Sequence, residues 1–129
     1  MGCDIHVFVE AKTYTGWHCV HHPHIGRWYS LFSKMANVRN DMPGSPYYVP
    51  PISEPRGLPD DVSDIARIIL MDGDNHSASW LSAAEWESIR ADERYRGDGK
   101  LSDVVPYELD SDYRDKRILD YRLVFAFDN

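Results

Sequence analysis

A proline-rich stretch in the middle of the chain carries the first candidate for chemistry. Residues 42–59 hold six of the eight prolines, so we expect a stiff, long loop with few conformations to lose on folding. Within it, Arg56 precedes Gly57, which permits close backbone approach, and a predicted helix start whose free N–H groups favour an anion. The loop could therefore present Arg56 to one phosphate or carboxylate. The alternative is an ion pair with a surface acid such as Glu54 or Asp60.

Residues 74–81 bring a second set of polar and reactive side chains close to another predicted helix. His76 can transfer protons or bind metal, the hydroxyls of Ser77 and Ser79 can hold phosphate oxygens, and the indole of Trp80 can stack on a base. The alternative is that the serines are turn residues and that the tryptophan belongs to the core.

Histidines near the N-terminus raise the question of a metal site. His6, His22 and His24 are expected to share one face of a hairpin with Asp4, and imidazole with carboxylate is a common ligand set. However, the run HCVHHPH has neither the spacing of a zinc finger nor a second cysteine pair. Imidazoles that pack or hydrogen-bond on a half-buried sheet are the simpler interpretation. The sequence therefore predicts no metal and no cofactor.

The elements that must position these residues begin with a predicted sheet. Residues 4–11 are rich in β-branched and aromatic side chains, and residues 17–22 form the returning strand after a turn at Gly16. Residues 121–128 predict a third strand. One face of that strand carries Tyr121, Leu123, Phe125 and Phe127.

The turn sets the expected register of the hairpin. If Gly16 closes a three-residue loop, Thr13 opposes Trp17, which then lies in the core with Cys19. Cys3 and Cys19 would be roughly 16 to 26 Å apart, whereas a disulfide requires Cα atoms within about 7 Å. The sequence therefore predicts two free thiols.

Three helices fit between these strands. Residues 28–38 carry apolar side chains at i, i+3, i+4 and i+7, and a second helix begins among residues 60–63, which are good caps. Residues 82–94 begin with the capping-box pair Ser82 and Glu85.

Length and composition limit the architecture. The 129 residues fit one domain, residues 1–129, and a chain that is 43% hydrophobic is too apolar for intrinsic disorder. The predicted fold class is α+β, with a small antiparallel sheet, made of the N-terminal hairpin and the C-terminal strand, packed with about three helices and a long proline-rich loop. The polar stretches 94–103 and 108–116 are expected to be surface connections.

Charge and hydropathy argue against several classes of partner. A formal net charge of -7 gives no general attraction to a phosphate backbone, which disfavours nonspecific nucleic-acid binding. No apolar segment approaches the roughly 20 residues of a membrane span, and the N-terminus lacks the regions of a signal peptide. We expect a cytoplasmic protein without a membrane partner, and a homo-oligomer is compatible with the sequence.

Five separated blocks resemble a single family. They are MGCDIHVFVE at 1–10, LFSKMANVRN at 31–40, EPRGLPDDVS at 54–63, HSASWL at 76–81 and LVFAFDN at 123–129. These blocks are similar to a family of small, mostly uncharacterised bacteriophage and bacterial proteins that begin Met-Gly-Cys-Asp-Ile-His. The chain has Ala126 where the family pattern carries a bulkier aromatic residue, which would widen a neighbouring pocket.

The resemblance selects polar residues from four regions of the chain, and such residues converge only at a site. The first strand begins at Asp4 and the last ends at Asp128, so antiparallel pairing would bring these ends side by side, with His76 and Arg56 overhanging them from loops. The expected ligand-binding residues are Asp4, His6, Arg56, Gly57, His76, Ser77, Ser79, Trp80, Asp128 and Asn129, and the pattern also includes Cys3 and Arg39.

Two functions from different classes follow from this set, which suits a nucleotide or another phosphorylated small ligand. The first is a phage-type protein that captures a nucleotide-derived molecule in the host cytoplasm, such as an immune signal, and thereby blocks defence. The second is a small phosphoesterase or related hydrolase in which His6 and His76 act as base and acid, Arg56 holds the phosphate, and a metal at Asp4 and His6 assists. Because the chain carries no recognised catalytic motif, the sequence favours capture.

Overall fold

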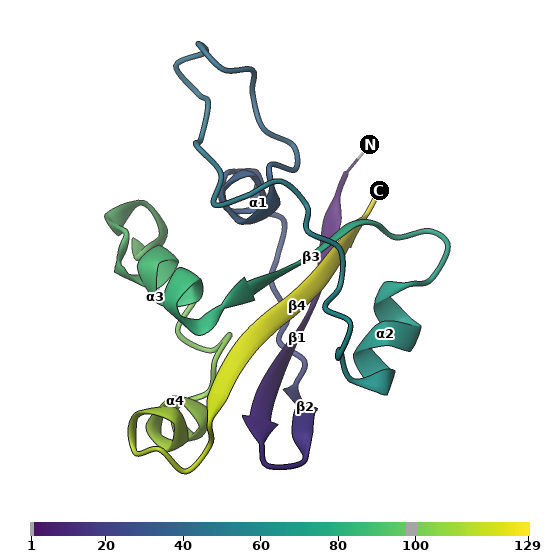
Figure 1. The fold of residues 1–129 in the computed structure, drawn as a ribbon. Coiled ribbons are helices and arrows are strands. Elements are labelled where there is room, and N and C mark those ends of the chain that lie inside the picture. The colour runs from purple at the N-terminus through teal and green to yellow at the C-terminus, as the bar shows by residue number, and fades with distance from the viewer. Residues whose placement is uncertain (1, 98–100) are drawn as a thin grey trace.

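The chain folds into one four-stranded antiparallel sheet with helices on both faces (Figure 1). A computed structural model describes residues 2–97 and 101–129. The strand order is β2-β1-β4-β3, so that the first and last strands of the chain are central neighbours. The bounds are Asp4–Thr13 for β1, Gly16–His21 for β2, His76–Ser82 for β3 and Asp120–Asp128 for β4. The predicted α+β class is confirmed.

Four α-helices lie among the described residues and cover the two faces of the sheet unequally. They are α1 at Tyr29–Ala36, α2 at Asp64–Leu70, α3 at Ala83–Ala91 and α4 at Tyr107–Arg114. A short 3-10 turn at Glu93–Tyr95 follows α3. The buried side chains place α2 on one face and α1, α3 and α4 on the other (Figure 1). Within the described ranges, no helix is long and apolar enough to span a bilayer.

The last strand supplies both layers of the core by alternation. As predicted, one of its faces carries Tyr121, Leu123, Phe125 and Phe127, all buried in the larger cluster. Val124 and Ala126 point to the opposite face, where α2 covers them. Both faces of β4 are therefore shielded from solvent, which explains why its polar residues lie near its ends.

The predicted helices are present with shifted ends. The stripe at residues 28–38 forms α1, which ends where Asn37 adopts a left-handed conformation with φ of 57°. The expected capping box starts α3, because the Glu85 N–H donates to Ser82 Oγ at 3.2 Å and the Ser82 N–H donates to Glu85 Oε1 at 2.9 Å. The second helix begins after Ser63, next to the expected range.

Residues 37–63, all of them described, connect α1 to α2 through turns and extended stretches. Part of this connection projects beyond α1 (Figure 1). The side chain of Asn40 closes the projecting lobe, because it donates to the Val49 carbonyl at 2.7 Å and accepts from the Val49 N–H at 3.0 Å. The proline-rich segment is thus a long loop that is held together by side-chain hydrogen bonds.

Two elements were not anticipated. Residues 76–82 form β3 rather than a loop. Ser79, which one interpretation of the sequence assigned to a turn, is fully buried in this strand. The predicted surface connection at 108–116 is wrong for most of its length, because α4 covers the larger core. The ring of Tyr113 meets Tyr121 edge to face at 5.0 Å.

The expected register of the hairpin is wrong by one residue. Thr13 opposes Gly16 and Lys12 opposes Trp17, so the loop has two residues instead of three. Trp17 consequently lies on the α2 face, where its ring sits 3.9 Å from the guanidinium of Arg122. Cys19 also packs on that face, and both cysteines are free thiols, as predicted.

A buried ion pair lies beneath this tryptophan. Glu10 and Arg122 face each other across β1 and β4 and are 0% and 6% exposed, and Arg122 Nε donates to Glu10 Oε1 at 2.8 Å. The second carboxylate oxygen accepts the Ser63 N–H at 2.8 Å, and Arg122 Nη1 donates to Asp61 at 3.0 Å. One pair of charges thus connects the two central strands to the start of α2.

Removal of one charge from this pair is expected to be more damaging than removal of both. Glu10→Leu leaves a buried guanidinium whose one remaining acidic partner is the exposed Asp61, and should lower the free energy of unfolding by up to about 3–5 kcal/mol. The double variant Glu10→Leu with Arg122→Met should lose much less, because no buried charge remains. Urea unfolding followed by circular dichroism measures both. Equal losses in the single and double variants would show that the pair itself stabilises the fold.

Candidate functional site

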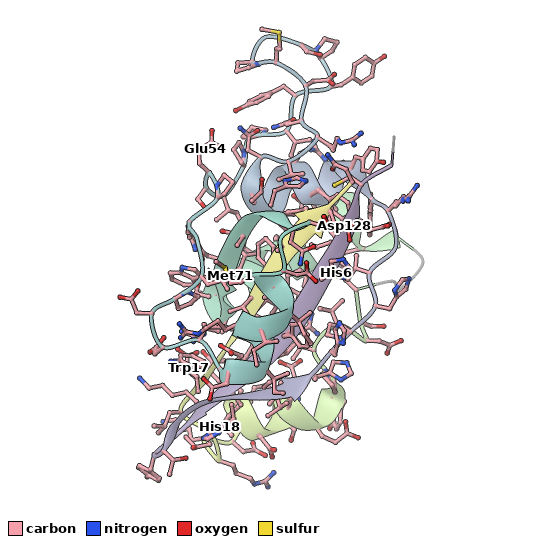
Figure 2. The ribbon with its side chains drawn as sticks, turned by 90° about the vertical axis from the view of Figure 1, so that its right-hand side faces the viewer. His6, Trp17, His18, Glu54, Met71 and Asp128 are labelled. Atoms are coloured by element: carbon pink, nitrogen blue, oxygen red, sulfur yellow. The ribbon has the colours of Figure 1, made fainter. Side chains whose placement is uncertain are left out.

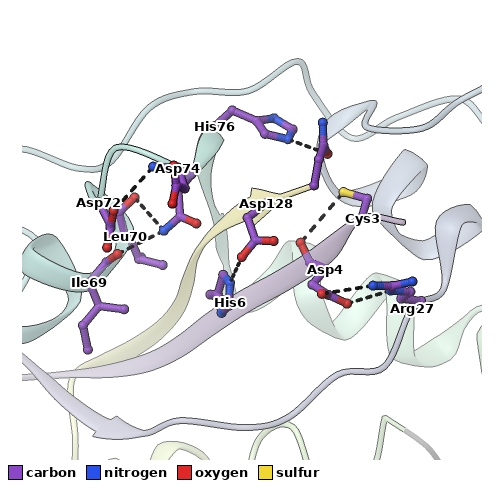
Figure 3. A network of polar contacts seen from close by, with 12 residues as sticks. Cys3, Asp4, His6, Arg27, Ile69, Leu70, Asp72, Asp74, His76 and Asp128 are labelled. Carbon is purple, nitrogen blue, oxygen red and sulfur yellow. Dashed lines mark hydrogen bonds and ion pairs between the residues drawn. The ribbon is translucent and has the colours of Figure 1, made fainter. Parts of the chain in front are cut away.

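The candidate site lies where the first residues of β1 meet the last residues of β4. Antiparallel pairing places Asp4 opposite Asp128 and His6 opposite Ala126, which is the side-by-side arrangement expected for the strand ends. Figure 3 shows His6, Asp128, Asp4 and His76 gathered there. We call His6, His76, Asp128 and Asn129 the two-histidine end.

His6 and Asp128 form a short, half-exposed pair on the α2 face of the sheet. His6 Nε2 donates to Asp128 Oδ2 at 2.6 Å, and the two side chains are 36% and 33% exposed. A carboxylate in this position fixes the orientation and tautomer of the imidazole. The proton therefore sits on Nε2, which leaves Nδ1 of His6 as a proton acceptor.

His76 is held by the residue that follows Asp128. Its Nε2 donates to Asn129 Oδ1 at 3.0 Å, and its Nδ1 lies 2.9 Å from Ser77 Oγ. The register shifts between His76 and Ser79, where β3 bulges away from β4. Ser77 lies in this bulge with φ of 56°, a left-handed conformation that costs about 1–3 kcal/mol for a residue other than glycine. Backbone strain thus accompanies one of the two histidines.

Arg27 joins this end from residues 22–28, the segment between β2 and α1. Its Nε donates to Asp4 Oδ1 at 2.8 Å and its Nη2 to Oδ2 at 3.3 Å. The hydrogen bond from Arg27 lowers the pKa of Asp4, with smaller contributions from the charges of Arg27 and His6. Both side chains of the pair are more than half exposed, so solvent screens it and it is weak.

Cys3 packs under the site. The residue is buried, its N–H donates to the Tyr29 hydroxyl at 3.0 Å, and burial raises the pKa of its thiol. The thiol therefore stays protonated at neutral pH. Arg39, which the family pattern also selected, lies over the ring of Tyr29 at 5.3 Å.

Arg56 lies in a different group of residues, at the start of α3. Its Nη1 and Nη2 donate to the two carboxylate oxygens of Glu85 at 2.8 and 2.6 Å, and its Nη1 also donates to the Trp80 carbonyl at 3.0 Å. The guanidinium lies over the Trp80 ring at 4.7 Å. The ion-pair interpretation therefore describes Arg56, although its partner is neither Glu54 nor Asp60.

The neighbours of Arg56 fasten the proline-rich loop to the edge of β3. The Arg56 N–H donates to Ser79 Oγ at 3.1 Å, and the Gly57 N–H donates to the Ala78 carbonyl at 2.8 Å. Gly57 has φ of 78°, which few other residues adopt at low cost. Close by along the chain, the N–H of Ser63 at the start of α2 is already bound by Glu10.

The expected site thus divides into two groups. The two-histidine end contains four of the expected residues, and Asp4 and Ser77 lie next to it in the sheet and along the chain. The loop fastener contains Arg56, Gly57, Ser79 and Trp80. Arg27 was missed because it lies outside every predicted element and outside the five sequence blocks.

Two of the three imidazoles considered as metal ligands have other partners. The His22 ring stacks on Phe8 at 4.2 Å, and His6 is paired with Asp128. Across residues 2–97 and 101–129, no three histidine, cysteine or acidic side chains form a group that could hold a metal ion.

No family model, no curated protein and no solved structure matches this chain. The resemblance based on five sequence blocks, and the phage origin that it implies, therefore stay predictions.

Loss of Arg56 is expected to affect stability. Arg56→Ala removes a partly buried, two-pronged ion pair and should lower the free energy of unfolding by about 1–3 kcal/mol. Arg56→Lys keeps the charge but loses the two-pronged hydrogen bonding. Its free energy of unfolding should therefore lie between those of the unaltered protein and Arg56→Ala. Thermal or urea unfolding measures this loss. A melting curve for Arg56→Ala that matches that of the unaltered protein would contradict the fastening role.

The same pair should make stability depend on pH in a defined window. The hydrogen bond from Arg56 lowers the pKa of Glu85 from 4.5 to about 2. Between these values the unfolded chain binds more protons than the folded one, so the contribution of the pair is complete above about pH 4.5 and is lost toward pH 2. The stability difference between the unaltered protein and Arg56→Ala should therefore shrink in acid. A difference that stays constant from pH 6 to pH 3 would contradict this linkage.

Proposed function

We propose that the protein binds a nucleotide-derived or other phosphorylated small molecule at the two-histidine end, where His6 acts on a phosphoester bond as a general base. The observation that carries this proposal is the 2.6 Å hydrogen bond from His6 Nε2 to Asp128. A histidine oriented by a carboxylate is the usual arrangement of a general base in hydrolases.

The proposed roles follow from the hydrogen bonds. With its Nε2 proton held by Asp128, His6 offers Nδ1 to a water molecule and takes a proton as that water attacks phosphorus. The departing oxygen takes its proton from the solvent. The proton taken by His6 also passes to the solvent, so each turnover consumes one water and breaks one P–O bond.

One strand end sets the positions of both imidazoles. Asp128, the last residue of β4, binds His6 on the α2 face of the sheet, and Asn129, which follows it, binds His76 beside Phe127 on the opposite face. Such pre-oriented groups reduce the entropy that must be lost to reach a reactive geometry. Because Arg56 is engaged by Glu85, Arg27 takes the role of the cation beside the phosphate.

Capture without chemistry is the second candidate. Both ring nitrogens of His76 already have partners within the protein, in Ser77 and Asn129, which favours a rigid, preformed binding surface. Sequestration of a host immune signal is one form of this candidate, and it depends on the resemblance to phage proteins.

A panel of nucleotides and cyclic nucleotides separates the two candidates. The protein is incubated with each compound, denatured by heat, and the released material is identified by mass spectrometry. Acid–base chemistry predicts a changed compound and a loss of turnover of about 100-fold or more in His6→Gln. Asp128→Asn should also lose turnover, because the amide no longer fixes the tautomer of His6.

His18→Gln is the matched control, since His18 lies far from His6 along the hairpin (Figure 2). It should turn over substrate normally. Recovery of a bound but intact compound from the unaltered protein would establish capture instead. If no compound is retained and none is changed, both candidates fail.

A further inference from the structure

A hollow of about 370 Å³ lies beside Arg27 and has no role in the proposed chemistry. Most of its wall comes from the segment between β2 and α1. It is lined by His24, Ile25, Gly26, Arg27, Trp28 and Leu101. This volume lies in the range of small-molecule sites, roughly 300–1,000 Å³.

The wall combines a flat apolar part with cationic groups. Trp28 meets Tyr95 edge to face at 5.5 Å, which fixes the indole, and the nearly buried Ile25 and Leu101 extend the apolar surface. Arg27 and His24 supply donors and positive charge. An aromatic ring joined to an anion matches such a wall, because indole stacks on bases and guanidinium binds phosphate in a fork.

Arg27 connects the hollow to the two-histidine end. Its guanidinium lines the hollow and binds both oxygens of Asp4, and Asp4 lies opposite Asp128 in the sheet. Asp128 in turn holds His6. A molecule that replaced Asp4 on Arg27 would therefore extend from the hollow toward the proposed base. Figure 3 shows Arg27, Asp4, Asp128 and His6.

One feature indicates that the Asp4 carboxylate can be exchanged, and another explains how the guanidinium is accommodated. The pair is more than half exposed, so its separation costs little. The guanidinium also lies against Gly2, where a Cβ atom would come within 2.0 Å of Arg27 Nη1. The absence of a side chain at Gly2 thus leaves room for the planar group in its present place.

We infer that the hollow binds the base and sugar of a nucleotide and that Arg27 exchanges Asp4 for the phosphate of that nucleotide, which places the phosphate beside His6. The inference rests on the proposed function for the identity of the reacting end. It adds the part of the ligand that does not react, and it assigns the residues that select it.

The test measures binding by isothermal titration calorimetry on His6→Gln, which prevents turnover. The probes are the four ribonucleoside 5′-monophosphates, the matching nucleosides and inorganic phosphate. At least one monophosphate should bind about 10-fold or more tightly than both its nucleoside and inorganic phosphate, since only it fills the hollow and engages Arg27.

Three substitutions added to this background probe the exchange. Arg27→Gln should weaken binding of the monophosphate about 10-fold or more. Gly2→Ala should weaken it without loss of stability, because the added methyl group displaces only the end of a flexible side chain. Asp4→Asn should tighten it, because the internal competitor is removed. Arg117→Gln, an exposed arginine paired with Asp112 on the last turn of α4, is the control and should bind normally.

Four results would overturn the inference. They are the failure of every monophosphate to bind at millimolar concentration, equal affinity for a monophosphate and its nucleoside, equal affinities of Arg27→Gln and Arg117→Gln, and weaker binding by Asp4→Asn. The proposed function fails separately. If a monophosphate binds through Arg27 while the unaltered protein changes no nucleotide, nucleotide binding in the hollow is supported and the acid–base role of His6 is contradicted.

Discussion

The buried charge pair between Glu10 and Arg122 is the constraint on which the rest of the structure depends. Its two members occupy opposing positions of β1 and β4, so a slip of one residue would place both charges in the apolar clusters without partners. The pair therefore fixes the register of the central strands. That register also sets the far end of the same strands, where Asp4 meets Asp128 and His6 reaches its carboxylate. A polar contact on the face of the sheet thus determines the geometry of a site at its end.

Local patterns predicted the elements whose own residues specify them. The alternation along residues 121–128 gave β4 with the correct faces, and the pair Ser82 and Glu85 gave the start of α3. The hairpin register could not be predicted in this way, because the position of Trp17 depends on a guanidinium from the other end of the chain. Likewise β3 resembles a turn in sequence, since its serines become strand residues only through pairing with β4.

The site was predictable to the extent that it follows from strand pairing. Antiparallel neighbours must bring a strand start beside a strand end, and this placed Asp4 and Asp128 correctly. The role of Arg56 was not predictable, because its partner Glu85 is 29 positions away and already serves as a helix cap. Proximity in sequence favoured Glu54, which instead accepts from an asparagine side chain. For Arg27, the path of an irregular segment decides the contact, and no local pattern encodes that path.

The fastened loop also affects how the molecule meets others of its kind. As the last strand in the sheet order, β3 has an outer edge that could template the addition of a foreign strand, which is a common route to aggregation. The bulge after His76 and the backbone bond from Gly57 to Ala78 occupy this edge, and prolines at 55 and 59 cannot donate to a ladder. The stiff loop thus covers the edge strand β3 and prevents neighbouring chains from adding a strand to the sheet beside the histidines.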